Sequence, residues 1–213
     1  MPGSLAGVGV VVLAAGRGTR MGGPKALMVV RGRPWWQWQS ERLAAAAAVG
    51  AAVYWVCSVE VMRAMEGARL PGRLVAGDSG AAMFGSVRVG LEAAAAVERD
   101  GGQRLRGVLV LPVDVPGAGV ATMERLVEAG RDGPVAPAHQ GVRGHPVWLN
   151  RKWILRVFEP AVAVAGGGGA ADASLRLDGL LAGGLRMLEV EDASVVVNLN
   201  TPKDVEAWVG SGL

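Results

Sequence analysis

Short apolar runs alternate with longer segments of helical periodicity along most of this chain. Continuous apolar and β-branched runs are typical of strands buried in a parallel sheet, and they predict strands over residues 8–13, 52–58, 73–76 and 107–111. Apolar positions at helical spacing predict helices over residues 35–49, 59–66, 86–99 and 118–129. Repeated β-α-β units imply an α/β fold with a mostly parallel, doubly wound sheet and helices on both faces.

The alternation loosens in the last third of the chain. Short strands are predicted over residues 135–138, 145–149, 185–190 and 195–198, and helices over residues 151–164 and 173–181. A run of four glycines at 166–169 predicts a flexible loop, with a mobile lid as one hypothesis for its role. A last helix is expected to begin at Pro202 with Thr201 as its N-cap, because proline and threonine favour those two positions.

Composition narrows the class of protein. The 213 residues fit one domain spanning 1–213, and 51% of them are hydrophobic, enough for a sizeable core. The net charge of +3 agrees with a phosphorylated small ligand, and is too small and too scattered to indicate nucleic-acid binding. The longest apolar run, residues 43–57, is shorter than the roughly 18–20 residues of a membrane span, so no membrane segment is expected.

One cysteine, Cys57, is present in the sequence. It excludes an internal disulfide and a metal site built from cysteines, and a cytoplasmic location is the simplest expectation.

The stretch LAAGRGTRMGGPKAL, residues 13–27, follows the first predicted strand and has the composition of a phosphate-binding loop. It is not a Walker P-loop, because Lys25 follows a proline and is followed by alanine instead of a hydroxyl residue. The dinucleotide fingerprint is matched at Gly16 and Gly18 but fails at Met21, where the third glycine belongs. The remaining design is a looser loop whose backbone N–H groups and flanking cations approach a triphosphate.

This stretch resembles the signature L-A-[AG]-G-x-G-x-R-M-G-x-P-K of the nucleotidyltransferases that make molybdenum cofactor dinucleotides, the MobA/MocA-like NTP-transferase family. Further segments resemble that family in the same order and extend the resemblance over nearly the whole chain: MFGSVRVGL (83–91), LPVDVPG (111–117), RGHPVWL (143–149) and NLNTPKDVEAW (198–208). The resemblance implies a single Rossmann-like domain that transfers a nucleotide from an NTP to a phosphate acceptor and releases pyrophosphate.

The resemblance also implies roles for individual residues. Lys25 is expected to contact the α-phosphate, and Arg20 to face the β- and γ-phosphates. Asp114 is the expected Mg²⁺ ligand, and Asn200 the candidate second ligand, at a position where the cytidylyl pattern has aspartate. The catalytic set is therefore Lys25, Arg20 and Asp114. The implied nucleotide-binding residues are Leu13, Ala14, Ala15, Gly16, Arg17, Gly18, Lys25, Ser86 and Asp114.

The base and the acceptor are less sharply implied. The pair Ala14–Ala15 and the segments GSVRVGL and RGHPV resemble the cytidylyl branch, whereas NLNTP resembles the guanylyl branch, so CTP is favoured over GTP. Arg143 and His145 are the expected acceptor-binding residues, and molybdopterin is the expected acceptor, with a molybdoenzyme as a further partner. The alternatives are guanylyl transfer to molybdopterin, a sugar or alditol phosphate acceptor, and a non-enzymatic chaperone that inserts a finished cofactor.

Three tryptophans, Trp35, Trp36 and Trp38, begin the second predicted element. Core and helix packing is the favoured role for Trp35 and Trp36, and Trp38 is a weaker candidate for an oligomer contact or the acceptor pocket.

Overall fold

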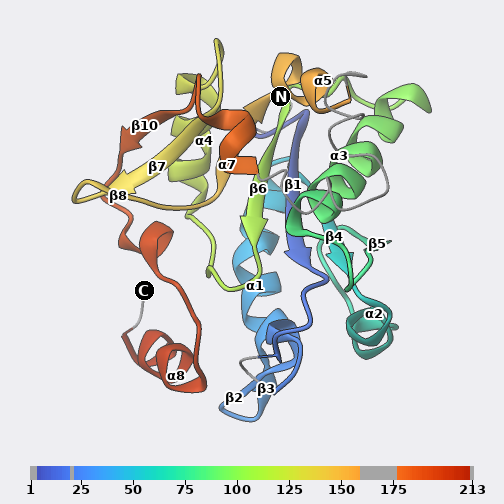
Figure 1. The fold of residues 1–213 in the computed structure, drawn as a ribbon, viewed down its shortest axis with the longest axis vertical. Coiled ribbons are helices and arrows are strands. Elements are labelled where there is room, and N and C mark those ends of the chain that lie inside the picture. The colour runs from blue at the N-terminus through green and yellow to red at the C-terminus, as the bar shows by residue number, and fades with distance from the viewer. Residues whose placement is uncertain (1–3, 20–21, 159–176, 212–213) are drawn as a thin grey trace.

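The computed structural model describes residues 4–19, 22–158 and 177–211. Within these ranges an eight-stranded sheet forms the centre of the fold (Figure 1). Seven strands follow one another across it in the order β5 (Arg73–Ala76), β4 (Ala52–Cys57), β1 (Val8–Ala14), β6 (Gly107–Pro112), β9 (Val147–Asn150), β7 (Val135–His139) and β10 (Arg186–Glu189). The eighth, β8 (Val142–Arg143), pairs with β7. A separate two-stranded sheet joins β2 (Val29–Val30) to β3 (Arg33–Pro34).

The sheet is mostly parallel. Strand β1 pairs in parallel with both β4 and β6, β4 does so with β5, and β7 with β10. Strand β9 is antiparallel to both of its neighbours, and β8 is antiparallel to β7. The predicted doubly wound α/β fold is confirmed, with β8 and β9 as its antiparallel members.

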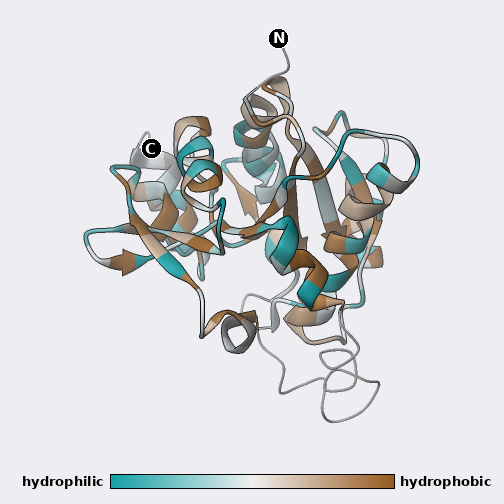
Figure 2. Cartoon of the chain, turned by 90° about the horizontal axis from the view of Figure 1, so that it is seen from above, coloured by the Kyte–Doolittle hydropathy of each residue, from teal (hydrophilic) through white to brown (hydrophobic). Residues whose placement is uncertain are grey.

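Both faces of β1 are buried, which explains its uninterrupted apolar sequence. Val8, Val10, Val12 and Ala14 belong to one buried cluster, whereas Val11 and Leu13 belong to a second cluster on the other face. Figure 2 shows hydrophobic segments running along the central strands, with helices on both sides of them.

Different helices complete the two clusters. The first cluster receives side chains from α1 (Trp35–Ala48), α2 (Val59–Met65), α4 (Val120–Ala129) and α8 (Pro202–Ser211). The second receives them from α3 (Met83–Arg99), α5 (Arg151–Val157) and α7 (Leu177–Leu181). Helix α3 lies very close to β1, because a Cβ atom at Gly90 would be 2.3 Å from Cγ1 of Val11. No helix in the described ranges combines the length and the apolar character that crossing a bilayer requires.

The last predicted strand is wrong. Residues 195–198 do not form a strand. The 3-10 helix η3 (Ala193–Val196) ends within this range, and the Asp192 carboxylate accepts the N–H of Ser194 at its start. The carbonyl of Val195 accepts the N–H of His145, and the N–H of Leu199 donates to the carbonyl of Asp114. These single hydrogen bonds to loops replace the ladder that a strand would need.

The starts of helices α3 and α8 can be compared with the predicted ones. Helix α3 starts at Met83, three residues before the predicted Ser86. Helix α8 starts at Pro202 as predicted. The Thr201 hydroxyl accepts the N–H of Asp204, and the Asp204 carboxylate accepts the N–H of Thr201, which forms a reciprocal capping box. The predicted helical residues 159–164 and 173–176 and the glycine run 166–169 lie outside the described residues.

The order of the strands indicates where a ligand would bind. From β1 the chain passes to β4 and β5 on one side, and then crosses to β6 on the other. In doubly wound sheets the crevice outside the carboxyl ends of the strands at such a reversal is the usual binding site. Here that crevice lies between the residues that follow β1 and those that follow β6.

Candidate active site

A cavity of about 220 Å³ opens at this reversal point. The segments that follow β1 and β6 contribute to its wall, together with the start of α3 and the loop before it. Seven of the residues predicted to bind the nucleotide line this cavity: Leu13, Ala15, Gly16, Gly18, Lys25, Ser86 and Asp114.

The glycine-rich loop folds back on itself at Gly18. This residue has a φ of +58°, and its carbonyl accepts the N–H of Gly23 over 3.3 Å. A Cβ at Gly18 would lie 1.9 Å from the carbonyl oxygen of Gly23, so only glycine fits there. The fold-back leads directly into a short 3-10 helix, η2 (Lys25–Leu27), which places Lys25 beside the cavity.

Lys25 lies between two oxygen-bearing side chains. Its Nζ is 2.7 Å from Oδ2 of Asp114 and 2.9 Å from Oδ1 of Asn200. The side chains of Lys25 and Asp114 are 21% and 25% exposed, so this ion pair is shielded but reachable. The fold therefore joins three sequence-predicted residues that are up to 175 positions apart.

Two hydrogen bonds from adjacent backbone N–H groups place Asn200. The preceding residue, Leu199, donates its N–H to the carbonyl of Asp114 over 2.8 Å. The N–H of Asn200 itself donates to Asp204 over 3.1 Å, within the cap of α8. The start of α8 is thus attached to the segment that carries Asp114.

The oxygen donors fit a divalent cation that arrives with a phosphate ligand. Among the described residues no group of three or more His, Cys, Asp or Glu side chains could hold a metal by itself. Asp114 and Asn200 offer one carboxylate and one amide oxygen that converge on the same point, the Nζ of Lys25. Mg²⁺ is commonly bound by one or two carboxylates, with waters and substrate phosphates as its other ligands.

Other predicted residues lie elsewhere. Ala14 is buried in the first core cluster. Arg17 is exposed and extends over the loop before α3, where a Cβ at Gly80 would lie 3.2 Å from its Nη2. Arg20 lies outside the described residues.

Arg143 and His145 do not belong to the described lining of the cavity. Arg143 is exposed on β8, and His145 precedes Pro146 through a cis peptide bond. The His145 N–H donates to the carbonyl of Val195 over 2.8 Å, which attaches this loop to η3.

Asp78 lines the cavity although it was not one of the expected site residues, and Met83 lines it as the first residue of the segment MFGSVRVGL. The Asp78 carboxylate accepts the N–H of Gly80 over 2.7 Å, which forms a tight Asx turn. The sequence signal for Asp78 is the DSG triplet, which begins two residues after the strand 73–76, since polar residues at the carboxyl ends of parallel strands face the binding crevice. Met83 is 65% exposed at the first position of α3.

Comparison with known proteins gives a family and several proteins of similar fold. A family model described as the MobA-like NTP transferase domain matches residues 10–177. A nucleotidyl transferase from Methanothermobacter has a similar fold, with a TM-score of 0.66 and 23% identity, over 96% of both chains. Rv0371c of Mycobacterium tuberculosis H37Rv in complex with manganese has a TM-score of 0.61 and 23% identity, over 96% of this chain and 98% of that one. The 2-C-methyl-D-erythritol 4-phosphate cytidylyltransferase of Thermus thermophilus has the same TM-score, 0.61, and 23% identity, over 95% and 98%.

No curated protein matches the chain. The similar structures share its fold, and the family model covers well over half of its sequence, including Lys25 and Asp114. The chain belongs to the MobA-like NTP transferase domain family.

Proposed function

We propose that this protein is a Mg²⁺-dependent nucleotidyltransferase that transfers CMP from CTP to the phosphate of molybdopterin and releases pyrophosphate. The observation that carries the proposal is the convergence of Asp114 and Asn200 on Lys25, with Nζ–O distances of 2.7 and 2.9 Å, while Lys25 and Asp114 line the cavity. Lys25 and Asp114 follow strands β1 and β6, and Asn200 comes from the segment before α8, so one ammonium group faces two oxygen atoms that can ligate a metal.

The reaction joins two anions, so charge repulsion is its first obstacle. An oxygen of the acceptor phosphate attacks the α-phosphorus, a new P–O bond forms, and the bond from the α-phosphorus to the bridging oxygen breaks as pyrophosphate leaves. In phosphoryl chemistry the protein contributes mainly positioning and charge neutralisation. Lys25 is the residue for the α-phosphate, and Arg17 and Arg20 are the residues for the departing phosphates.

Asp114 and Asn200 are the residues that would hold Mg²⁺. The bound ion would neutralise negative charge on the phosphates. Asn200 supplies an oxygen without a charge, so Asp114 carries the electrostatic part of this binding.

Two features of the cavity lining support cytosine as the base. Ala15 lines the cavity and is 2% exposed, so its methyl group adds bulk to the wall where a purine would need room. Asp78, in the same lining, offers a carboxylate that can accept a hydrogen bond from an exocyclic amine, which cytosine has and uracil lacks. The NLNTP segment keeps GTP as the second candidate nucleotide.

The acceptor residues are proposed to be Arg143 and His145. Their support is indirect: the His145 N–H donates to Val195 of η3, which leads within a few residues to Asn200. A cationic side chain and an imidazole suit a phosphate monoester. A molybdoenzyme would then receive the finished dinucleotide cofactor.

A sugar or alditol phosphate is the second candidate acceptor, and the relative from Thermus is named for such a substrate. The methylerythritol cytidylyltransferases carry an arginine near the position of Met83. This chain has methionine there, and the difference favours molybdopterin as the acceptor. A chaperone without catalysis would not need the Lys25–Asp114 pair.

Thermal unfolding with Mg²⁺ and each of CTP, GTP, UTP and ATP tests the nucleotide. A ligand at 100 times its Kd stabilises the native state by about 2.7 kcal/mol, which shifts the midpoint visibly. We expect CTP to give the largest shift, and the same shift to be lost in Asp114→Ala. A larger shift with GTP would replace the cytidylyl assignment by the guanylyl one, and no shift with any nucleotide would contradict the proposal.

Pyrophosphate release with molybdopterin and with an alditol phosphate then identifies the acceptor. We expect release with molybdopterin. Nucleotide binding without pyrophosphate release from either acceptor would favour the chaperone.

A further inference from the structure

Three side chains of α1 hold backbone carbonyls of the segment that carries Asp114. The indole Nε1 of Trp35 donates to the carbonyl of Val113 over 2.7 Å, and Nε2 of Gln39 donates to the carbonyl of Val115 over 2.8 Å. The Nη2 of Arg42 donates to the carbonyl of Gly117 over 3.1 Å. Residues 35, 39 and 42 share one face of a helix, since residues three and four apart are neighbours there.

Asp114 is thereby fixed from both sides. The carbonyls immediately before and after it are held by Trp35 and Gln39, and its own carbonyl accepts the N–H of Leu199 over 2.8 Å. The N–H of Val113 donates to Leu13 of β1, and that of Val115 to Pro112. With the backbone held on these sides, the carboxylate is left facing the Nζ of Lys25, 2.7 Å away.

Packing alone does not account for Gln39. The residue is 0% exposed, and within the described part of the chain its Oε1 has no hydrogen-bond partner. A buried, unpaired amide oxygen is costly for folding, so an apolar residue would serve the core better. What glutamine adds at this place is the N–H that reaches Val115.

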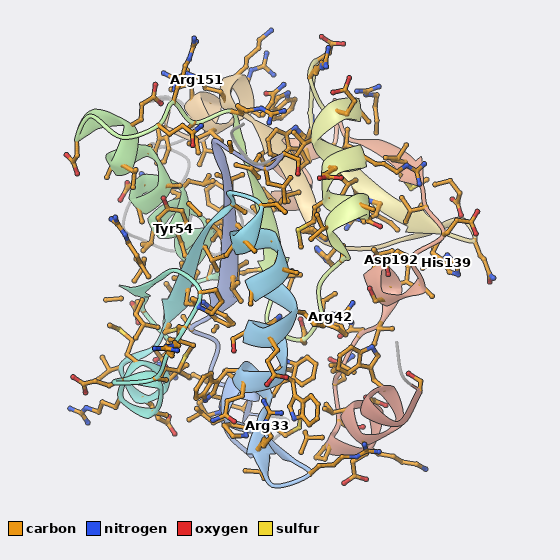
Figure 3. All side chains as sticks on the ribbon, turned by 180° about the vertical axis from the view of Figure 1, so that it is seen from behind. Arg33, Arg42, Tyr54, His139, Arg151 and Asp192 are labelled. Atoms are coloured by element: carbon orange, nitrogen blue, oxygen red, sulfur yellow. The ribbon has the colours of Figure 1, made fainter. Side chains whose placement is uncertain are left out.

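Arg42 adds further contacts between α1 and the neighbouring segments, at a greater distance from the cavity. Its guanidinium also donates to the Ser194 hydroxyl over 3.3 Å and lies 5.3 Å from the ring centroid of Trp208. Figure 3 shows Arg42 leaving α1 towards the segment that holds Asp192. Burial lowers the pKa of Arg42, and the charge of Asp192 offsets part of that effect.

We propose that Trp35 and Gln39 are positioning residues for Asp114: they hold the carbonyls on either side of it so that its carboxylate is aimed at the site of the cation and of Lys25. The inference rests on the proposed function and goes beyond it, because it assigns a role in cation binding to two residues of α1 that do not line the described cavity. It also gives a role to the indole N–H of Trp35, a residue for which the sequence predicted only core and helix packing.

Binding of Mn²⁺, as a paramagnetic substitute for Mg²⁺, tests the proposal without an activity assay. Free Mn²⁺ is followed by electron paramagnetic resonance while the metal is titrated into protein with CTP or with GTP, against the nucleotide alone. Gln39→Met keeps the length of the side chain and removes the donor, and Trp35→Phe keeps an aromatic ring and removes the indole N–H. We expect each variant to bind Mn²⁺ about 10- to 100-fold more weakly, the usual range for residues that orient a metal ligand.

Leu43→Met is the matched control. Leu43 is fully buried on the same helix, and its aliphatic side chain can form no hydrogen bond to the segment 113–117. Its Mn²⁺ affinity is expected to equal that of the wild type. Thermal midpoints of all variants identify any that fail to fold. If Gln39→Met does not fold, Trp35→Phe is the variant that tests the proposal.

The double variant Gln39→Met/Asp114→Asn separates positioning from general destabilisation. If Gln39 acts through Asp114, the double variant binds Mn²⁺ no more weakly than Asp114→Asn alone; fully additive losses would overturn the proposal. Unchanged affinity in Gln39→Met and Trp35→Phe, with a loss in Asp114→Asn, would also overturn it and leave the proposed function intact. Unchanged affinity in Asp114→Asn would overturn both.

Discussion

Lys25 is the residue in which local sequence and distant contacts meet. Its place beside the cavity could be predicted from Gly-Gly-Pro-Lys, because the loop motif is local. Its partnership with Asp114 and Asn200 is carried by contacts across 89 and 175 positions. Trp35 illustrates the limit: its burial follows from its place in an apolar segment, but the partner of its indole N–H is 78 residues away. Periodicity contains no information on such a pair.

Lys25→Ala should lower turnover by roughly 10²- to 10³-fold, the range for removing one preorganised charge-stabilising group. The physical reason is that no described cation other than Lys25 lines the cavity to offset charge at the α-phosphate. Steady-state pyrophosphate release at saturating nucleotide measures it. Lys152→Ala, an exposed lysine on α5, is the control and should keep full turnover. Turnover near that of the wild type in Lys25→Ala would contradict the assignment.

At the scale of elements, the regular parts of the fold could be predicted and the irregular parts could not. Strands β4 and β5 and helices α1 and α2 end within one residue of the bounds expected from apolar patterning. The 3-10 helix η3 was mistaken for a strand because Val195, Val196 and Val197 are β-branched. Its conformation is decided by Asp192 and by hydrogen bonds to the loops at His145 and Asp114, which lie far away in sequence.

Gly90→Ala tests the contact between α3 and β1. Alanine in place of glycine inside a helix gains about 1 kcal/mol from propensity. Against that, the new Cβ would lie 2.3 Å from Val11, and such overpacking typically costs about 1–3 kcal/mol. We therefore expect a net loss in the free energy of unfolding, measured by urea titration. Gly85→Ala on the same helix, where the nearest atom is the Ala81 Cβ at 3.2 Å, should be close to neutral. A stabilised Gly90→Ala would show that α3 can move away from the sheet.

For the molecule as a whole, one carboxylate joins parts that the sequence places far apart. Oδ2 of Asp192 accepts the N–H of Gly119 over 2.8 Å and the hydroxyl of Thr122 over 3.1 Å at the start of α4. Oδ1 accepts the N–H of Ser194 in η3 over 3.1 Å. Burial by itself would raise the pKa of Asp192, but hydrogen bonds from Ser194, Gly119 and Thr122 outweigh it, and the pKa is lowered from 3.8.

A lowered carboxylate pKa stabilises the fold above the unfolded-state value, and this stability is lost as the pH falls through the folded-state value. Asp192→Asn should therefore reduce the free energy of unfolding at pH 7 by about 1 kcal/mol, the usual cost of weakening hydrogen bonds from partly buried donors to a charged group. The difference from the wild type should shrink as the pH falls below 3.8. Urea unfolding at several pH values measures both effects. Asp132→Asn, at an exposed position, should follow the wild type throughout, and a gap that stays constant with pH would contradict the role of the Asp192 charge.

The ion pair between Lys25 and Asp114 has a consequence for the order of loading. A cation that binds Asp114 must first displace an ammonium group, and the released ammonium needs another anion. A nucleotide phosphate supplies that anion, so each ligand removes an obstacle to the other, and the coupling is necessarily reciprocal. The cavity would then bind a divalent cation weakly in the absence of the triphosphate and tightly in its presence. Free cations in solution would therefore occupy it little until the nucleotide is bound.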